Sequence, residues 1–212
     1  MHTIDEAAGP RPPLTVAAAT KIILESGAIA AILVEGWSDQ AALEALAHLR
    51  GLDLAAERIV ILPVGGATNN GKFLEALGPR GLNVRLAGLV DAKEEAHLWR
   101  YLERAGLGSS LGRAAAEVLG FFVCDEDLED ELIRSLGAAF VEQLVALQGE
   151  LPSFRRFQSQ PAQRERDRHA QLRRFLGTRA RRKIRYGTVL ANALDLHRVP
   201  RALDAVLAHA RD

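Results

Sequence analysis

The stretch AAILVEGWSDQAALEALAHLRG, residues 30–51, joins a short apolar run to an amphipathic helical pattern through a Glu–Gly pair. The apolar run has the length of a buried strand, and the spacing after it is that of a helix. The same order recurs three times along the chain. An apolar run precedes a helical pattern at 58–66 and 69–78, at 83–91 and 92–106, and at 120–127 and 128–137. Strands that alternate with helices predict an α/β fold with a sheet of roughly four mainly parallel strands, flanked by helices.

The regions outside this alternation read as helical or irregular. Residues 14–27 have helical apolar spacing, and beyond Gly137 successive helices are expected at 138–151, 162–177, 182–195 and 200–210. We therefore expect a flexible N-terminus (1–13), an α/β domain (14–149) and a C-terminal helical extension packing on it (150–212). The composition, 48% hydrophobic and 25% charged, is that of an ordinary soluble protein.

Cys124 is the only cysteine, so the chain can form no internal disulfide, and a reducing cytoplasm fits best. The first residues lack the basic and apolar pattern of a signal peptide. No apolar run is long enough for a membrane span. We read Cys124 as a core residue, and expect Trp37 to pack over the sheet.

The stretch PVGGATNNGKF, residues 63–73, contains most of a phosphate-binding loop, because Gly66, Gly71 and Lys72 fit G-x-x-x-x-G-K. Such a loop needs Ser or Thr after the lysine to bind Mg²⁺, and here Phe73 follows. A nucleotide triphosphatase is therefore the less favoured alternative. The preferred interpretation is a tight turn at Gly65 and Gly66, with Lys72 as a contact to a nucleic-acid phosphate.

Acidic residues follow three of the four predicted strands: Glu35, Asp91 and Asp125. Asp39 and Glu129 lie one helical turn beyond Glu35 and Asp125, so each pair can face one point. Ligands of parallel sheets bind at the carboxyl ends of the strands, and carboxylates gathered there suit Mg²⁺. Any one of these acids could instead cap a helix N-terminus.

Charges are segregated along the chain although the formal net charge is zero. Residues 121–150 contain eight acids and one base, and residues 155–185 contain twelve bases and two acids. This pattern fits a metal site beside a polyanion-binding surface. It fits equally well two oppositely charged elements that pack on each other.

The motif VEGWSD (34–39), followed by LVDAKEE (89–95), resembles the Toprim domain shared by topoisomerases, DnaG-type primases and several nucleases. Among its branches the OLD-family nucleases look most similar, because the acidic segment CDEDLEDEL (124–132) and a lysine in the C-terminal helices, Lys183, also have counterparts there. The chain resembles a free-standing Toprim module without the ATPase portion of those proteins.

The resemblance implies a Mg²⁺- or Mn²⁺-dependent phosphoryl-transfer enzyme, a nuclease in the first place. It implies Glu35 as general base or metal ligand, and Lys183 as the group that stabilises charge at phosphorus. The implied metal ligands are Glu35, Asp39, Asp91, Glu94, Asp127 and Glu129. The expected nucleic-acid contacts are Lys72, Arg173, Arg174, Arg181, Arg182 and Arg185. A separate ATPase subunit and a homodimer are possible partners.

One position departs from the family pattern Asp-x-Asp, because the triplet is Asp91-Ala92-Lys93. A lysine cannot ligate Mg²⁺, so one metal position is either lost or filled by Glu94 or Glu95. The alternative function is therefore a non-catalytic module that binds nucleic acid or a partner ATPase.

Overall fold

The computed structural model describes residues 12–109 and 112–212, so the flexible N-terminus expected at 1–13 lies, apart from its last two residues, outside the described part. The centre is a four-stranded sheet with the order β2-β1-β3-β4, and every pairing is parallel. The strands are β1 (Ala30–Val34), β2 (Ile59–Pro63), β3 (Arg85–Val90) and β4 (Phe121–Val123). The predicted α/β class with a parallel sheet is confirmed.

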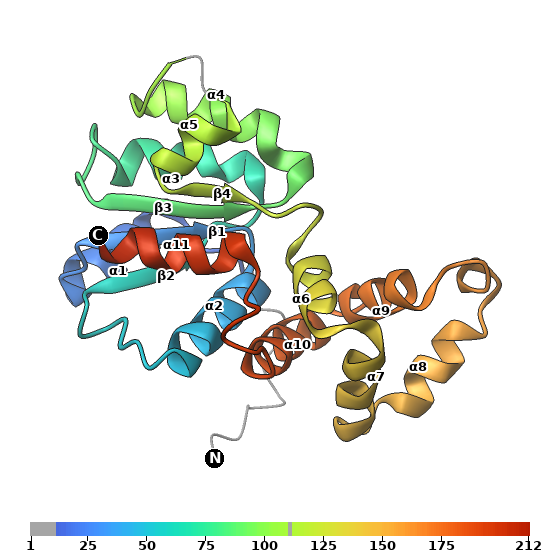
Figure 1. Cartoon of the computed structure of the whole chain (residues 1–212). Helices are drawn as coiled ribbons and strands as arrows, with labels where there is room; N and C mark the ends of the chain where they lie inside the picture. The colour runs from blue at the N-terminus through green and yellow to red at the C-terminus, as the bar shows by residue number, and fades with distance from the viewer. Residues whose placement is uncertain (1–11, 110–111) are drawn as a thin grey trace.

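Both faces of the sheet are buried, because successive side chains of each strand point to opposite sides. Ala31 and Leu33 of β1 pack on one face beneath α1 (Val16–Ser26), α3 (Ala67–Leu77), α4 (Glu95–Ala105) and α5 (Arg113–Val118). Ile32 and Val34 face the other side, which α2 (Trp37–Leu49) and α11 (Arg201–Arg211) cover (Figure 1). This layered packing fixes the strand ends in space.

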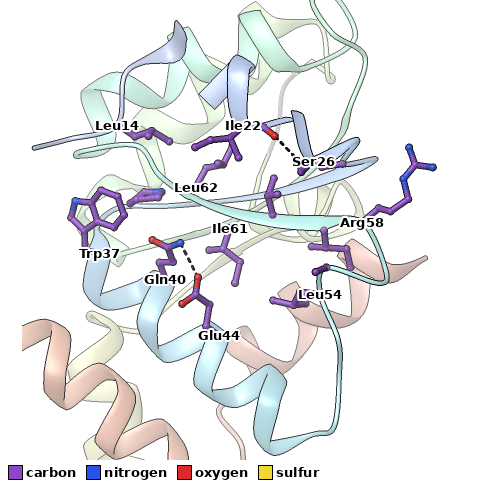
Figure 2. Close-up of a pocket in the computed structure, with 15 residues that line it drawn as sticks. Leu14, Ile22, Ser26, Trp37, Gln40, Glu44, Leu54, Arg58, Ile61 and Leu62 are labelled. Atoms are coloured by element: carbon purple, nitrogen blue, oxygen red, sulfur yellow. Dashed lines mark hydrogen bonds between the residues drawn. The ribbon is translucent and has the colours of Figure 1, made fainter. Parts of the chain in front are cut away.

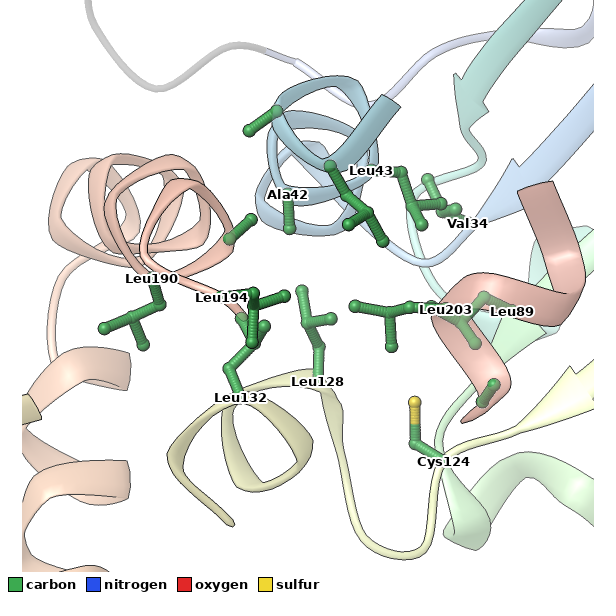
Figure 3. Packing of buried hydrophobic residues seen from close by; sticks show 14 of the residues in the cluster. Val34, Ala42, Leu43, Leu89, Cys124, Leu128, Leu132, Leu190, Leu194 and Leu203 are labelled. Carbon is green, nitrogen blue, oxygen red and sulfur yellow. The ribbon is translucent and has the colours of Figure 1, made fainter. Parts of the chain in front are cut away.

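The C-terminal helices extend the second face of the sheet into a lobe (Figure 1). They are α6 (Leu128–Leu136), α7 (Ala138–Leu147), α8 (Leu151–Gln158), α9 (Arg168–Gly177) and α10 (Ala180–Asn192). Helix α10 packs along α2, and α11 then returns to lie on β1, β3 and β4. Val34, Leu128, Leu190 and Leu203 consequently share one apolar core (Figure 3). Cys124 is buried in it, and burial raises the pKa of its thiol.

The helical expectations differ from the structure at three places. Helices α5 and α8 have no counterpart in the predicted elements. The helix expected at 162–177 is instead a short 3-10 helix, η2 (Pro161–Gln163), followed by α9. Asp167 starts α9 because its side chain accepts a hydrogen bond from the Ala170 N–H at 2.7 Å, which is the local bond of an N-cap. Within the described ranges, no helix is both long and apolar enough to span a bilayer.

Candidate metal centre

The carboxyl ends of β1 and β3 form the point where the strand order reverses. Strand β1 pairs with β2 on one side and with β3 on the other, so the connections leave in opposite directions and open a crevice between the two strand ends. Glu35 directly follows β1 and Asp91 directly follows β3. The topology therefore brings together two acids that are far apart in the sequence.

Asp39 is held inward by the first turn of α2. The Gly36 N–H donates to its Oδ2 at 2.8 Å, and the Ser38 hydroxyl donates to its Oδ1 at 3.2 Å. The side chain is nonetheless buried, and burial raises the pKa of Asp39, with Glu35 adding to the rise while Lys183 and the Gly36 N–H oppose it. The helix cap thus positions a carboxylate that is poorly hydrated.

Asp91 lies at the start of a 3-10 helix, η1 (Ala92–Glu94), with 15% of its side chain exposed. Burial, together with repulsion from Glu35 and Asp39, raises its pKa to about 7. The Lys93 ammonium lies 3.5 Å from Asp91 Oδ2. Glu35, more than any other group, raises the pKa of Lys93. The carboxylates of Glu35 and Asp91 therefore act on the same ammonium.

Glu129 reaches the same region from the first turn of α6 and pairs with Lys183 of α10, Nζ to Oε2, at 3.3 Å. Burial raises the pKa of Glu129 to about 7 even though Lys183 opposes the rise. Burial alone lowers the pKa of Lys183, but Glu129, Asp39 and Asp91 outweigh it and raise the pKa overall. Lys183 is thus a permanent cation among carboxylates.

A glycine lets α10 bring this lysine close to α2. A Cβ atom at Gly187, one turn beyond Lys183, would lie 2.6 Å from the Ser38 carbonyl oxygen. Real Cβ atoms do not approach backbone so closely, so only glycine allows the two helices to touch here. The close approach holds the Lys183 turn beside the N-terminus of α2, where Asp39 lies.

We call Glu35, Asp39, Asp91 and Glu129 the acidic cluster. Its donors are carboxylate oxygens, the ligands that Mg²⁺ prefers, and its crowded negative charge already attracts two ammonium groups. The donor chemistry therefore fits a divalent cation. Among the described residues, no three Asp, Glu, His or Cys side chains converge at ligand spacing, so binding a metal requires side-chain rotation within the cluster.

Asp127 and Glu94, two further expected ligands, have other partners. Asp127 accepts from the Asp130 N–H at 2.9 Å and from Nε and a terminal nitrogen of Arg173 at 2.8 and 2.6 Å. Glu94 lies 3.5 Å from His97 on the next turn. Asp127 therefore forms a neutral pair at the border of the acidic cluster.

The expected nucleic-acid arginines divide between partly buried ion pairs and an exposed groove. Arg173 pairs with Asp127, and Arg182 and Arg185 both pair with Glu150. Arg182 also stacks on the Phe175 ring at 4.0 Å. We call these contacts, together with those of Arg155 and Arg168 to Glu142, the ion-paired seam. The acidic and basic segments thus pack against each other.

A groove of about 560 Å³ borders this seam, and Arg166, Arg173 and Arg174 line it together with Asp127. Arg174 is exposed there, and Arg181 is exposed on α10. The groove places basic side chains next to an acid that borders the acidic cluster.

The glycine turn after β2 is tied to the acidic cluster by its backbone. The N–H groups of Gly65 and Gly66 donate to the Glu35 carbonyl oxygen at 3.0 and 3.2 Å, and both residues have positive φ. Those N–H groups consequently do not point at a ligand as they would in a phosphate-binding loop. Phe73 is buried in the core, as its apolar character indicated, and Lys72 is exposed on α3.

A second cavity, of about 390 Å³, lies along the edge strand β2 (Figure 2). Leu14, Ile22, Trp37 and Ile61 line it, and Gln40 donates to Glu44 on its wall at 2.8 Å. None of the four acids of the cluster lines it. Trp37 thus packs at the sheet edge.

Two residues that shape the site were not identified from the sequence. Ser38 orients Asp39, and Gly187 sets the distance between α2 and α10. A glycine inside the helical pattern 182–195 was a usable signal, because such a glycine costs helix stability and usually has a packing reason. Ser38 gave no such signal, since serine is common at helix starts.

Comparison with known proteins agrees with the fold. Residues 28–92 match the model of the "Overcoming lysogenization defect protein-like, TOPRIM domain" family. The C-terminal region of the Xanthomonas campestris pv. campestris OLD protein superimposes with a TM-score of 0.67 and 26% identity, over 88% of this chain and 93% of that one.

The C-terminal region of the Burkholderia pseudomallei OLD protein superimposes with a TM-score of 0.64 over 87% of this chain and 98% of that one; at 22% identity it supports the fold alone. No curated protein sequence matches the chain significantly. The family match covers both Glu35 and Asp91, and the structural match, over 88% of the chain, extends well beyond those residues. The chain therefore contains a Toprim domain related to those of the OLD nucleases.

Proposed function

We propose that this protein is a Mg²⁺- or Mn²⁺-dependent phosphodiesterase that hydrolyses nucleic acid at the acidic cluster. The observation that carries the proposal is the convergence of Asp39, Asp91 and Glu129, from three separate elements, on one half-buried lysine, Lys183. Such crowding costs folding free energy, and proteins keep shifted carboxylates mainly where chemistry needs them. The relationship to the OLD nucleases supports the same reaction class.

Glu35, Asp39, Asp91 and Glu129 are the residues that would hold the metal, which would polarise the phosphodiester and lower the pKa of bound water. Lys183 places a fixed positive charge in a partly buried site, where it stabilises negative charge that develops at phosphorus. Ser38 and the Gly36 N–H hold the Asp39 carboxylate in one orientation.

The groove lined by Arg166, Arg173 and Arg174 is the proposed path of the nucleic-acid backbone. Arginines that contact phosphates raise affinity without reading the base sequence. Arg174 is exposed in the groove, whereas Arg182 and Arg185 are committed to Glu150. We therefore assign phosphate binding to Arg166 and Arg174, and a structural role to Arg182 and Arg185.

Lys93 favours one alternative, a Toprim module that binds nucleic acid without cleaving it. Its ammonium lies against Asp91, in the position where the family pattern has a second acid. If the ammonium blocks metal binding altogether, the groove can bind nucleic acid while the acidic cluster stays inactive.

A cleavage assay tests the proposal on labelled single- and double-stranded DNA and RNA with Mg²⁺ or Mn²⁺. We expect Glu35→Gln and Asp91→Asn to lower the cleavage rate about 1,000-fold, because each removes a negative charge from the site that would hold the metal. Asp125→Asn is the matched control, since this exposed acid follows β4 but pairs with Arg134 outside the cluster. If both cluster variants cleave as fast as the parent chain, the acidic cluster is not the catalytic site. Binding without cleavage by the parent chain establishes the alternative.

A further inference from the structure

The formal charges around the acidic cluster do not match a centre with two divalent cations. Four carboxylates face two ammonium groups, those of Lys93 and Lys183, which leaves two negative charges. Asp127 adds nothing to this balance because Arg173 neutralises it. One divalent cation makes the site neutral, and a second would leave it with two uncompensated positive charges in a poorly hydrated crevice.

The position of Lys93 makes it the natural occupant of a cation position. It follows Asp91 by two residues on η1, its Nζ lies 3.5 Å from Asp91 Oδ2, and Glu35 is the acid that interacts with it most strongly. Glu35 and Asp91 follow adjacent strands, and the ammonium lies against Asp91 at the end of β3. Its side chain is 66% exposed, so it reaches this place from solvent without burying its stem.

Lys183 approaches from the opposite side and is fixed by the contact of α10 with α2. It pairs with Glu129, whereas Lys93 pairs with Asp91, so the two ammonium groups neutralise different carboxylates. The remaining acids are Glu35, which follows β1, and Asp39, in the first turn of α2; neither has an ion pair within 4 Å among the described residues. These two acids are left for a metal.

We propose that the Lys93 ammonium takes the place of one divalent cation, so that this centre holds a single metal ion per chain, bound mainly by Glu35 and Asp39. The inference rests on the proposed metal-dependent function but concerns the stoichiometry of the centre. The lysine neutralises Asp91 with a fixed positive charge, and the single metal ion would neutralise the charge that remains on Glu35 and Asp39.

Binding of Mn²⁺ to the full chain, followed by electron paramagnetic resonance or calorimetry without nucleic acid, tests this stoichiometry. We expect one Mn²⁺ per chain in the parent protein and two in Lys93→Asp, which replaces a cation with a ligand. Lys93→Met should bind one Mn²⁺ about tenfold more tightly, because a repelling charge near the ion is lost. Lys21→Asp is the control for the charge change, since Lys21 pairs with Glu25 on the exposed face of α1, and it should bind like the parent.

The outcomes separate this inference from the proposed function. Two Mn²⁺ ions in the parent chain, or one in both the parent and Lys93→Asp, overturn the role of Lys93 and leave the nuclease proposal standing. No Mn²⁺ binding by the parent chain overturns both. Circular dichroism of each variant shows whether it is folded. The inference is supported if a folded Lys93→Asp variant binds two Mn²⁺ ions while Lys21→Asp binds one.

Discussion

The acidic cluster and the ion-paired seam are built from the same residue types, yet their electrostatics differ. In the seam each carboxylate has arginine partners, as Asp127 has Arg173 and Glu150 has Arg182 and Arg185. In the cluster, burial and mutual repulsion raise the pKa of Asp91 and of Glu129 to about 7. Paired carboxylates are neutralised by their arginines, whereas crowded carboxylates cost folding free energy, a cost that the proposed metal ion would offset.

The largest stability effect should come from the glycine that joins the two regions. Gly187→Ala places a Cβ 2.6 Å from the Ser38 carbonyl oxygen and should lower the free energy of unfolding by about 2 kcal/mol, despite the better helix propensity of alanine. It should also weaken the ion pair between Lys183 and Glu129, because α10 would carry Lys183 away from α6.

Gly177→Ala in α9 is the matched control, since a Cβ there meets nothing within 4 Å. Urea denaturation should show it to be as stable as the parent or slightly more stable. An equal loss of stability in both variants would mean that the contact between α2 and α10 does not need a glycine.

The pH dependence of stability should reveal the acidic cluster directly. A carboxyl whose pKa is raised on folding stabilises the folded state below its ordinary pKa and loses that contribution as pH rises through about 7. In EDTA, the free energy of unfolding should therefore fall by about 2 kcal/mol between pH 5 and pH 8. Denaturation with about 10 mM Mg²⁺ should reduce this loss, because a ligand that binds the folded state stabilises it. A free energy of unfolding that stays constant or rises over this range in EDTA would contradict the shifted pKa values.

The smallest expected changes in stability come from an Asp→Asn substitution, which should have opposite signs in the acidic cluster and in the ion-paired seam. In EDTA at pH 8, Asp91→Asn relieves repulsion and should stabilise the chain by about 1 kcal/mol. Asp127→Asn removes a charged partner of Arg173 and should destabilise it by about 1 kcal/mol. Thermal denaturation of the two variants measures the difference, and a shift of equal sign in both would erase the distinction between cluster and seam.

Much of the sheet could be predicted because its signals are local. Buried strands of five or six apolar residues followed by amphipathic helices place β1, β2 and β3, and Glu35 and Asp91 follow from the strand ends. The short helices α5 and α8 could not be predicted, because six to eight residues give too little periodicity. The sequence could not decide what the arginines bind either, since a run of basic residues pairs equally well with phosphates or with acids that folding brings near.

The sequence by itself determined the α/β class, the Toprim motif and the identity of the acids at the strand ends, because each depends on patterns within a few residues. Only the tertiary structure decided that Lys183 meets Glu129, that Lys93 lies against Asp91, and that Arg173 neutralises Asp127. The Lys183 and Arg173 pairs join residues far apart in the sequence, and they depend on how closely α10 and α9 dock, which Gly187 controls for α10 by the absence of a single carbon atom. Electrostatic partners are a property of packing, because charge interacts through space rather than along the chain.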